Sequence, residues 1–252
     1  MLWLLLTNLL LSLLYTGPGN AAPVAEGHPL LRWLSWCPYS QLLGKYGVNR
    51  VSIVGADTND PNVAVVFGPQ WRAFGAAGIS FSCTPMDDSP FTKRIVVQAE
   101  MLLLNRGAEL FIDGLRVGKN NYWYVESPLL VGVDLLPRKW PIRLYPVAGF
   151  GVNMRLAARV TDRNGDTADI QGTNLFDLGV LAGVVTEVAV DQWVLSSEIR
   201  YERGLMPLGD AQDFDDLHHA TWSILIGVGY RFSTPGRIAD RSSTADAPQP
   251  RE

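Results

Sequence analysis

Thr221–Phe232 reads T-W-S-I-L-I-G-V-G-Y-R-F, and its alternate positions differ in polarity. The even-numbered positions are all apolar or aromatic, whereas the odd-numbered ones include Thr221, Ser223, two glycines and Arg231. A period of two is typical of a β-strand, because successive side chains point to opposite faces of a sheet. Aromatic residues at both ends of the apolar face favour a strand with lipid on its outer side and a crowded barrel lumen on its inner side.

The preceding strand-like run, 192–203, alternates in the same way, here with the apolar side chains at odd-numbered positions that include Trp193 and Tyr201. The residues of these two runs that we expect to face lipid are Trp193, Tyr201, Trp222, Ile224, Ile226, Val228, Tyr230 and Phe232. A soluble lipocalin-like barrel is the less favoured alternative. It requires the aromatic faces to turn inward and places Glu198, Arg200 and Arg231 on a wet exterior.

Eight strand-like runs follow one another along the chain, each near or above the ~9–11 residues that a tilted strand needs to cross hydrocarbon. They span 48–56, 71–83, 93–104, 121–134, 141–155, 175–189, 192–203 and 220–232. The connections alternate between short ones and the long segments 57–70, 105–120, 156–174 and 204–219, as in outer-membrane barrels. We therefore expect an all-β fold, an eight-stranded antiparallel up-and-down transmembrane β-barrel over residues 48–232. Its long connections lie outside the cell and both chain ends lie in the periplasm.

The regions outside the barrel differ in composition. Residues 1–21 are mostly leucine followed by small residues, which is typical of a signal peptide, although no Lys or Arg precedes the leucine run. A retained anchor and a misassigned start are the alternatives. Residues 22–47 are expected to form an N-terminal periplasmic segment, and the polar residues 233–252 a disordered C-terminal tail.

Composition excludes some classes of function. The chain has 252 residues, 47% of them apolar and 18% charged, so one barrel domain accounts for its length and wholesale disorder is excluded. Its net charge of −4 gives no basic footprint for nucleic acid. We expect no nucleic-acid partner and no cofactor.

Charged residues recur on the inner face of the predicted strands. Four acids oppose four bases there: Glu100, Glu126, Glu187 and Glu198 against Arg143, Arg155, Arg200 and Arg231. A buried ion costs several kcal/mol unless it is paired, so equal numbers of each sign predict a cross-linked polar core. An eight-stranded barrel is just wide enough for its side chains to fill, and this favours a plugged lumen over a narrow selective pore.

Several strand motifs occur together in a fixed order. They are Ile95–Gly107 with Glu100, Tyr124–Leu130 with Glu126 and Pro128, Phe176–Gly179, Glu198–Tyr201 followed by Gly204, and Gly229–Phe232. This ordered set resembles the small bacterial outer-membrane β-barrel family often labelled porin-family or PorT-like. The resemblance implies the barrel fold and an outer-membrane location. The chain departs from the family pattern after Phe232, where a polar tail follows. In the family the terminal aromatic residue normally lies near the chain end.

Three smaller constellations have weaker functional interpretations. His218 and His219 lie near Ser223 and the acids Asp213, Asp215 and Asp216, as an activated nucleophile in lipid A modification requires, but any polar loop has a similar composition. Oxygen-bearing side chains between Asp162 and Asp169 suit Ca²⁺, yet the full calcium-loop pattern is missing, which favours a hydrophilic turn. Cys37 and Cys83 both fall on the periplasmic side, but Cys83 shares the parity of lipid-facing Ile79 and Phe81, which favours two unpaired thiols.

The sequence thus predicts a non-enzymatic, monomeric outer-membrane barrel with a structural, adhesive or ligand-contact role for its long loops. Its partners are outer-membrane lipid and the machinery that inserts barrels. The alternative is a narrow porin-like channel, or a component of a secretion or envelope-assembly complex whose partner is unknown.

Overall fold

The computed structural model describes residues 39–54, 65–84, 94–112, 114–137, 140–170, 174–207 and 217–233. The chain divides into two units, Met1–Trp36 and Cys37–Glu252, and all of the described residues belong to the second. The predicted signal peptide, the predicted segment up to residue 38 and the predicted tail beyond residue 233 lie outside the described residues. No helix in the described ranges is long and apolar enough to span a membrane.

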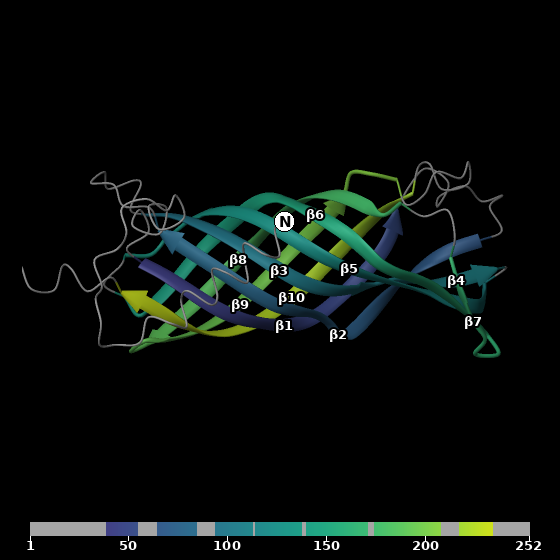
Figure 1. Cartoon of the computed structure of the whole chain (residues 1–252), viewed down its shortest axis with the longest axis horizontal. Helices are drawn as coiled ribbons and strands as arrows, with labels where there is room; N and C mark the ends of the chain where they lie inside the picture. The colour runs from purple at the N-terminus through teal and green to yellow at the C-terminus, as the bar shows by residue number, and fades with distance from the viewer. Residues whose placement is uncertain are drawn as a thin grey trace, which may run out of the picture. The chain divides into compact units, whose positions relative to one another are not determined.

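All regular elements of the described ranges are β-strands, and all strand pairs are antiparallel. The strands are β1 (Tyr39–Val54), β2 (Val65–Thr84), β3 (Ile95–Arg106), β4 (Ala108–Ile112), β5 (Leu115–Val133), β6 (Ile142–Asp162), β7 (Thr167–Asp169), β8 (Phe176–Val190), β9 (Trp193–Gly204) and β10 (His218–Ser233). Eight of them pair in the order β1-β2-β3-β5-β6-β8-β9-β10, and β10 pairs back with β1. The ring is therefore a closed, eight-stranded antiparallel barrel, which confirms the predicted fold (Figure 1).

Two short strands extend the sheet beyond the ring on the side of the long connections. β4 pairs with the start of β2 and with β5, and β7 pairs with the end of β6. Figure 1 shows both at one end of the barrel. They occupy segments 105–120 and 156–174, which the sequence predicts to be long loops, because strands β2, β5 and β6 continue past the ring instead of ending at its rim.

The largest boundary difference concerns the first strand. β1 begins at Tyr39, so residues 39–47 belong to the barrel and not to the predicted N-terminal segment. This half of β1 has adjacent Leu42 and Leu43 on opposite faces, with Gln41 and Lys45 on the buried face, and so lacks a regular apolar alternation. A bulge also interrupts its pairing with β2 between Gly47 and Asn49.

The two faces of the ring have opposite environments. Trp222, Ile224 and Ile226 of β10 are 51%, 40% and 61% exposed, whereas Arg200 of β9 is 1% exposed. β8 and β9 alternate in the same sense along almost their whole length. This arrangement is the reverse of the lipocalin-like alternative, which needs the aromatic side chains inside the barrel and the charged ones outside.

The interior contains apolar layers as well as polar ones. One apolar cluster joins Leu102, Leu104, Tyr122, Tyr124 and Leu225 with neighbouring alanines, and another joins Val96, Leu130, Tyr145 and Leu181 with two valines. The ladder runs in register through Pro128, and the irregularity of β5 lies instead between Trp123 and Tyr124. The lumen is therefore filled from wall to wall by side chains of both kinds.

Candidate functional site: a charge network inside the barrel

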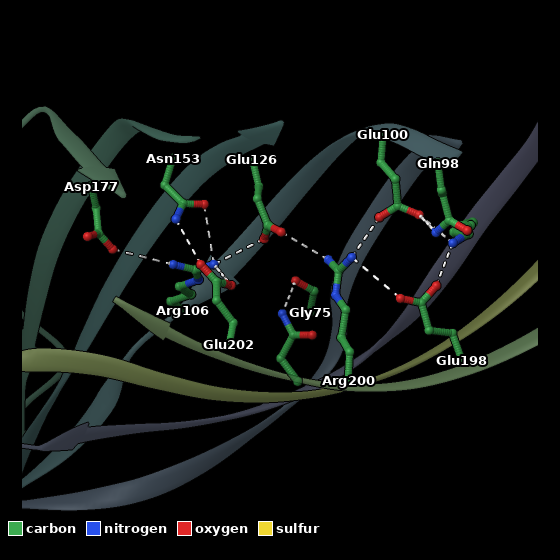
Figure 2. Close-up of polar contacts among 12 residues, drawn as sticks. Gly75, Gln98, Glu100, Arg106, Glu126, Asn153, Asp177, Glu198, Arg200 and Glu202 are labelled. Atoms are coloured by element: carbon green, nitrogen blue, oxygen red, sulfur yellow. Dashed lines mark hydrogen bonds and ion pairs between the residues drawn. The ribbon is translucent and has the colours of Figure 1, made fainter. Parts of the chain in front are cut away.

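Arg200 of β9 is the central cation of the interior. Its Nη1 donates to Oε2 of Glu100 on β3 at 2.6 Å, and its Nη2 donates to Oε1 of Glu126 on β5 at 3.2 Å. Its Nη1 also lies 3.7 Å from Oε1 of Glu198, two residues before it on β9. Arg200 thus joins three strands of the ring across the lumen (Figure 2).

Lys45 of β1 is a second cation in the same network. Its Nζ donates to Oε2 of Glu198 at 2.5 Å and forms a further hydrogen bond with Glu100. Gln98 completes the set by donating from Nε2 to Oε1 of Glu100 at 2.7 Å. Glu100 is therefore held by a lysine, an arginine and an amide at once.

Arg106 of β3 is the third cation and extends the network along the barrel. Its Nη2 donates to Oε2 of Glu126 at 3.0 Å and also to Glu202 of β9. Its Nη1 lies 3.9 Å from Oδ2 of Asp177 on β8. Asn153 supports Glu202 with a hydrogen bond of 2.8 Å. Glu126 bridges Arg106 and Arg200, so the contacts from Asp177 to Gln98 in Figure 2 form one continuous series, and the contact of Gly75 drawn there is separate from it.

A separate polar group lies nearer the end of the barrel that carries the short connections. Glu187 of β8 accepts hydrogen bonds from Tyr145 at 2.5 Å, from Arg143 at 3.2 Å and from Gln41. Arg143 also donates from Nε to Oδ2 of Asp134 at 2.8 Å. The predicted pair of Arg143 with an interior acid is thus formed with Glu187.

The predicted set of eight charges is divided by the structure. Glu100, Glu126, Glu198 and Arg200 lie together in the central network, and Glu187 with Arg143 in the second group. Arg155 and Arg231 are half-buried and form no ion pair with another described residue, and each has one guanidinium nitrogen without a hydrogen-bond partner. Sequence reasoning missed Lys45 and Arg106, which fall outside the predicted strand bounds.

These contacts explain why charges remain in the interior. The side chains of Lys45, Glu100, Glu126, Arg106 and Arg200 are at most 3% exposed, and each is held by at least two partners. Breaking a buried pair is strongly destabilising, since it leaves a charge in a medium that solvates it poorly. The arrangement therefore acts as a cross-link between strands.

Two cavities among the described residues lie away from the central network. One of about 190 Å³ lies at the end with the short connections and is lined by Ser40, Gln41, Arg143, Arg231 and their neighbours. Another of about 540 Å³ lies between the ends of β5 and β6 and is lined by Arg116, Lys119, Asp162 and Arg163 among others. None of the network's arginines, lysine or glutamates lines either cavity, so neither cavity crosses the barrel.

The candidate catalytic group does not assemble among the described residues. His219 is buried, and its Nε2 lies 3.0 Å from the hydroxyl of Tyr124, with the Tyr122 ring packed edge-on against it. His218 faces a different partner, the carbonyl oxygen of Met206 at 3.1 Å. Ser223 is buried in the ladder, and Asp213, Asp215 and Asp216 lie outside the described residues.

The calcium and cysteine interpretations also have structural outcomes. Asp162 accepts hydrogen bonds from the backbone N–H groups of Asn164 and Asp166, both at 2.8 Å, as in a hydrophilic turn. No group of three His, Cys, Asp or Glu side chains suited to a metal occurs in the ranges given above.

Cys83 is buried and disulfide-bonded, which corrects the expectation of an unpaired thiol on the outer face. Cys37, the other cysteine of the chain, lies outside the described residues.

No protein-family model matches the chain, and no curated protein matches it either. The fold resembles small outer-membrane barrels. OprG from Pseudomonas aeruginosa is 12% identical with a TM-score of 0.46, covering 79% of this chain and 98% of that one. Outer membrane protein W from E. coli is 14% identical with a TM-score of 0.41, covering 77% and 98%. Ail from Yersinia pestis is 13% identical with a TM-score of 0.39, covering 77% and 99%.

These TM-scores are low, so the fold assignment depends on the chain's own strand pairing. The matched structures do not identify a PorT-like family, and that resemblance stays a prediction from the sequence motifs.

Proposed function

We propose that this chain is an integral outer-membrane β-barrel whose lumen is sealed by its own side chains and whose role is contact at the cell surface. The observation that carries the proposal is the inversion of the two faces around a closed ring. Large apolar side chains are exposed outside, while Glu126, Arg106 and Arg200 are fully buried inside. In water such an exterior is a large exposed apolar surface, whereas in lipid it is the solvated face.

Backbone pairing also supports lipid as the surroundings of the ring. In hydrocarbon every N–H and C=O group needs a partner, and a closed ladder provides one for each residue of the ring. The ring has no free edge because β10 pairs with β1 over sixteen register positions. Export through the predicted signal peptide and insertion by the outer-membrane machinery belong to this proposal, as does the PorT-like affiliation suggested by the motifs.

The surface role is inferred from the sheet beyond the ring. β4, β7 and the ends of β2, β5 and β6 form an ordered extension on the side of the long connections. Its exposed residues mix apolar and charged types, such as Leu115, Ile112 and Arg116. Such a mixed, exposed surface on a rigid scaffold is where binding residues are expected. A catalytic role has no support in the placement of His219 and Ser223.

The test is expression in a Gram-negative host, with separation of the envelope into soluble and membrane fractions. The proposal predicts recovery in the outer-membrane fraction, extraction only with detergent, and a shift of gel mobility on heating. Recovery as a soluble periplasmic protein would contradict it. Because the lumen packing is a separate property, conductance is measured independently, as described below.

A further inference from the structure

Two arginines face outward beyond the apolar face of the ring, on the side of the long connections. Arg50 of β1 pairs in register with Trp222 of β10 and with Trp71 of β2. Arg203 of β9 lies one outward step beyond Tyr201, which pairs with Trp222. Arg50, Trp71, Tyr201, Arg203 and Trp222 are called the rim patch below.

The rim patch has the composition of a membrane interface. Trp71 is 60% exposed, and the Tyr201 and Trp222 rings pack with centroids 5.1 Å apart. Exposed Ile224 and Ile199 continue the outer face toward the middle of the barrel. Since Trp and Tyr gather at the boundary between hydrocarbon and headgroups, the guanidinium groups of the patch reach headgroup level.

The charges of the patch are available to a ligand. Within the part of the chain that the structure describes, neither the Arg50 nor the Arg203 guanidinium has an ion pair or a hydrogen bond. Arg159 of β6 provides the contrast. It is exposed two residues beyond Ala157, the register partner of Trp123, and its Nε lies 3.4 Å from Oδ1 of Asp169. An arginine in a similar place thus has a carboxylate neighbour, whereas the two arginines of the patch have none among the described residues.

We propose that the rim patch binds the phosphate groups of lipid A, the phosphorylated glycolipid of the outer leaflet. Guanidinium groups bind phosphate oxygens in pairs of parallel hydrogen bonds. β1 and β9 lie on either side of β10, about 10 Å from each other, and Arg203 lies two residues, about 7 Å, along β9 from the residue in register with Arg50, so the two backbones are roughly 12 Å apart. This separation suits a glycolipid with two phosphates better than a phospholipid with one. The inference rests on the proposed outer-membrane location and orientation.

The experiment uses the full mature chain inserted in phosphatidylcholine nanodiscs that contain diphosphoryl lipid A, dephosphorylated lipid A or phosphatidylglycerol. Native mass spectrometry counts the lipids retained after release. The variants are Arg50→Gln with Arg203→Gln, and Arg159→Gln as the matched control. We expect the double variant to lose roughly 25-fold in retention of diphosphoryl lipid A, about fivefold for each arginine. The control retains it.

The possible results distinguish a failure of this inference from a failure of the proposed function. Equal retention by the double variant and the unaltered chain, or retention that ignores the phosphates, overturns the inference. Retention of phosphatidylglycerol as strong as that of diphosphoryl lipid A overturns the choice of lipid. Insertion is followed separately by the heat-dependent shift in gel mobility. A chain that fails to insert contradicts the proposed function itself, whereas one that inserts without phosphate dependence contradicts this inference alone.

Discussion

Arg200 of β9 donates a hydrogen bond of 2.6 Å to Glu100 of β3, and the two residues are 100 positions apart in sequence. β3 and β9 are not neighbours in the ring, so this contact crosses the lumen. In the ring order β1-β2-β3-β5-β6-β8-β9-β10 the two strands are four steps apart in either direction, so the contact joins opposite walls of the closed barrel. The interior ion pairs therefore link walls that backbone pairing does not join directly.

Replacing Arg200 by Met tests how much this closure depends on charge. The substitution leaves Glu100, Glu126 and Glu198 without a cation that all three contact, and we expect a loss of about 3–5 kcal/mol in the free energy of unfolding. Urea titration of the barrel in lipid vesicles, followed by gel mobility, measures it. Arg159→Met on the outer face of β6 is the control, with a change within about 0.5 kcal/mol because this arginine is exposed. Equal losses in the two variants would show that the interior pairs are not what stabilises the barrel.

Lys45 and Glu198 are expected to be energetically coupled, because Nζ and Oε2 are 2.5 Å apart in a buried site. In a double-mutant cycle with Lys45→Met and Glu198→Gln, the double variant should be less destabilised than the sum of the single ones by about 0.5–3 kcal/mol. Lys45→Met combined with Asp134→Asn, which belongs to the other polar group, should be additive. Additivity in both cycles would argue against the contact between Lys45 and Glu198.

The outer face made the fold predictable. Each ring strand carries an alternating apolar stripe, such as Trp222, Ile224 and Ile226, and the eight predicted strands each correspond to one strand of the ring. Where the stripe is irregular, the boundaries shift: the first half of β1 has Leu42 and Leu43 on opposite faces beside Gln41 and Lys45, and the sequence predicts it to lie outside the barrel. β4 and β7 carry too few residues for a period to be recognised.

The sequence predicts that the interior is charged, but it does not predict which charged residues contact one another. Parity alone assigns Glu198 and Arg200 to the inner face of one strand. Which residue lies opposite them depends on how far neighbouring strands are staggered around the ring, and a period of two carries no information about stagger. Lys45 and Arg106 show the consequence, since both contact predicted acids and neither belongs to the predicted set.

Gly47 is expected to be intolerant of substitution. A Cβ added there would overlap the carbonyl oxygen of Ile224, which is backbone and cannot move aside cheaply. Gly47→Ala should therefore lower the free energy of unfolding by about 1–3 kcal/mol. Gly44 on the same strand is the matched control, because its Cβ would lie 3.8 Å from the nearest atom, the carbonyl oxygen of Val228. A tolerated Gly47→Ala would mean that β1 and β10 are less closely paired at this position.

Lipid A itself should be chemically unchanged by this protein. His219 is in hydrogen-bond contact with Tyr124 inside the barrel wall, and Ser223 is buried in the ladder, five positions after β10 begins at His218. The mass spectrum of lipid A from cells that express the chain should match that from cells with the empty vector. A mass change that disappears in His219→Ala would establish catalysis instead.

The lumen should not conduct ions. Arg106, Glu126 and Arg200 lie in one continuous series of contacts across the interior, and all three side chains are at most 1% exposed, so no water-filled path passes them. In planar bilayers the unaltered chain should show no stepwise conductance. Arg106→Ala combined with Arg200→Ala removes two large side chains from the plug and should introduce conductance, provided that the heat-dependent gel shift shows a closed barrel. Steps in the unaltered chain that persist in this variant with the same amplitude would favour the narrow-channel alternative, because the network would then lie beside the ion path and not across it.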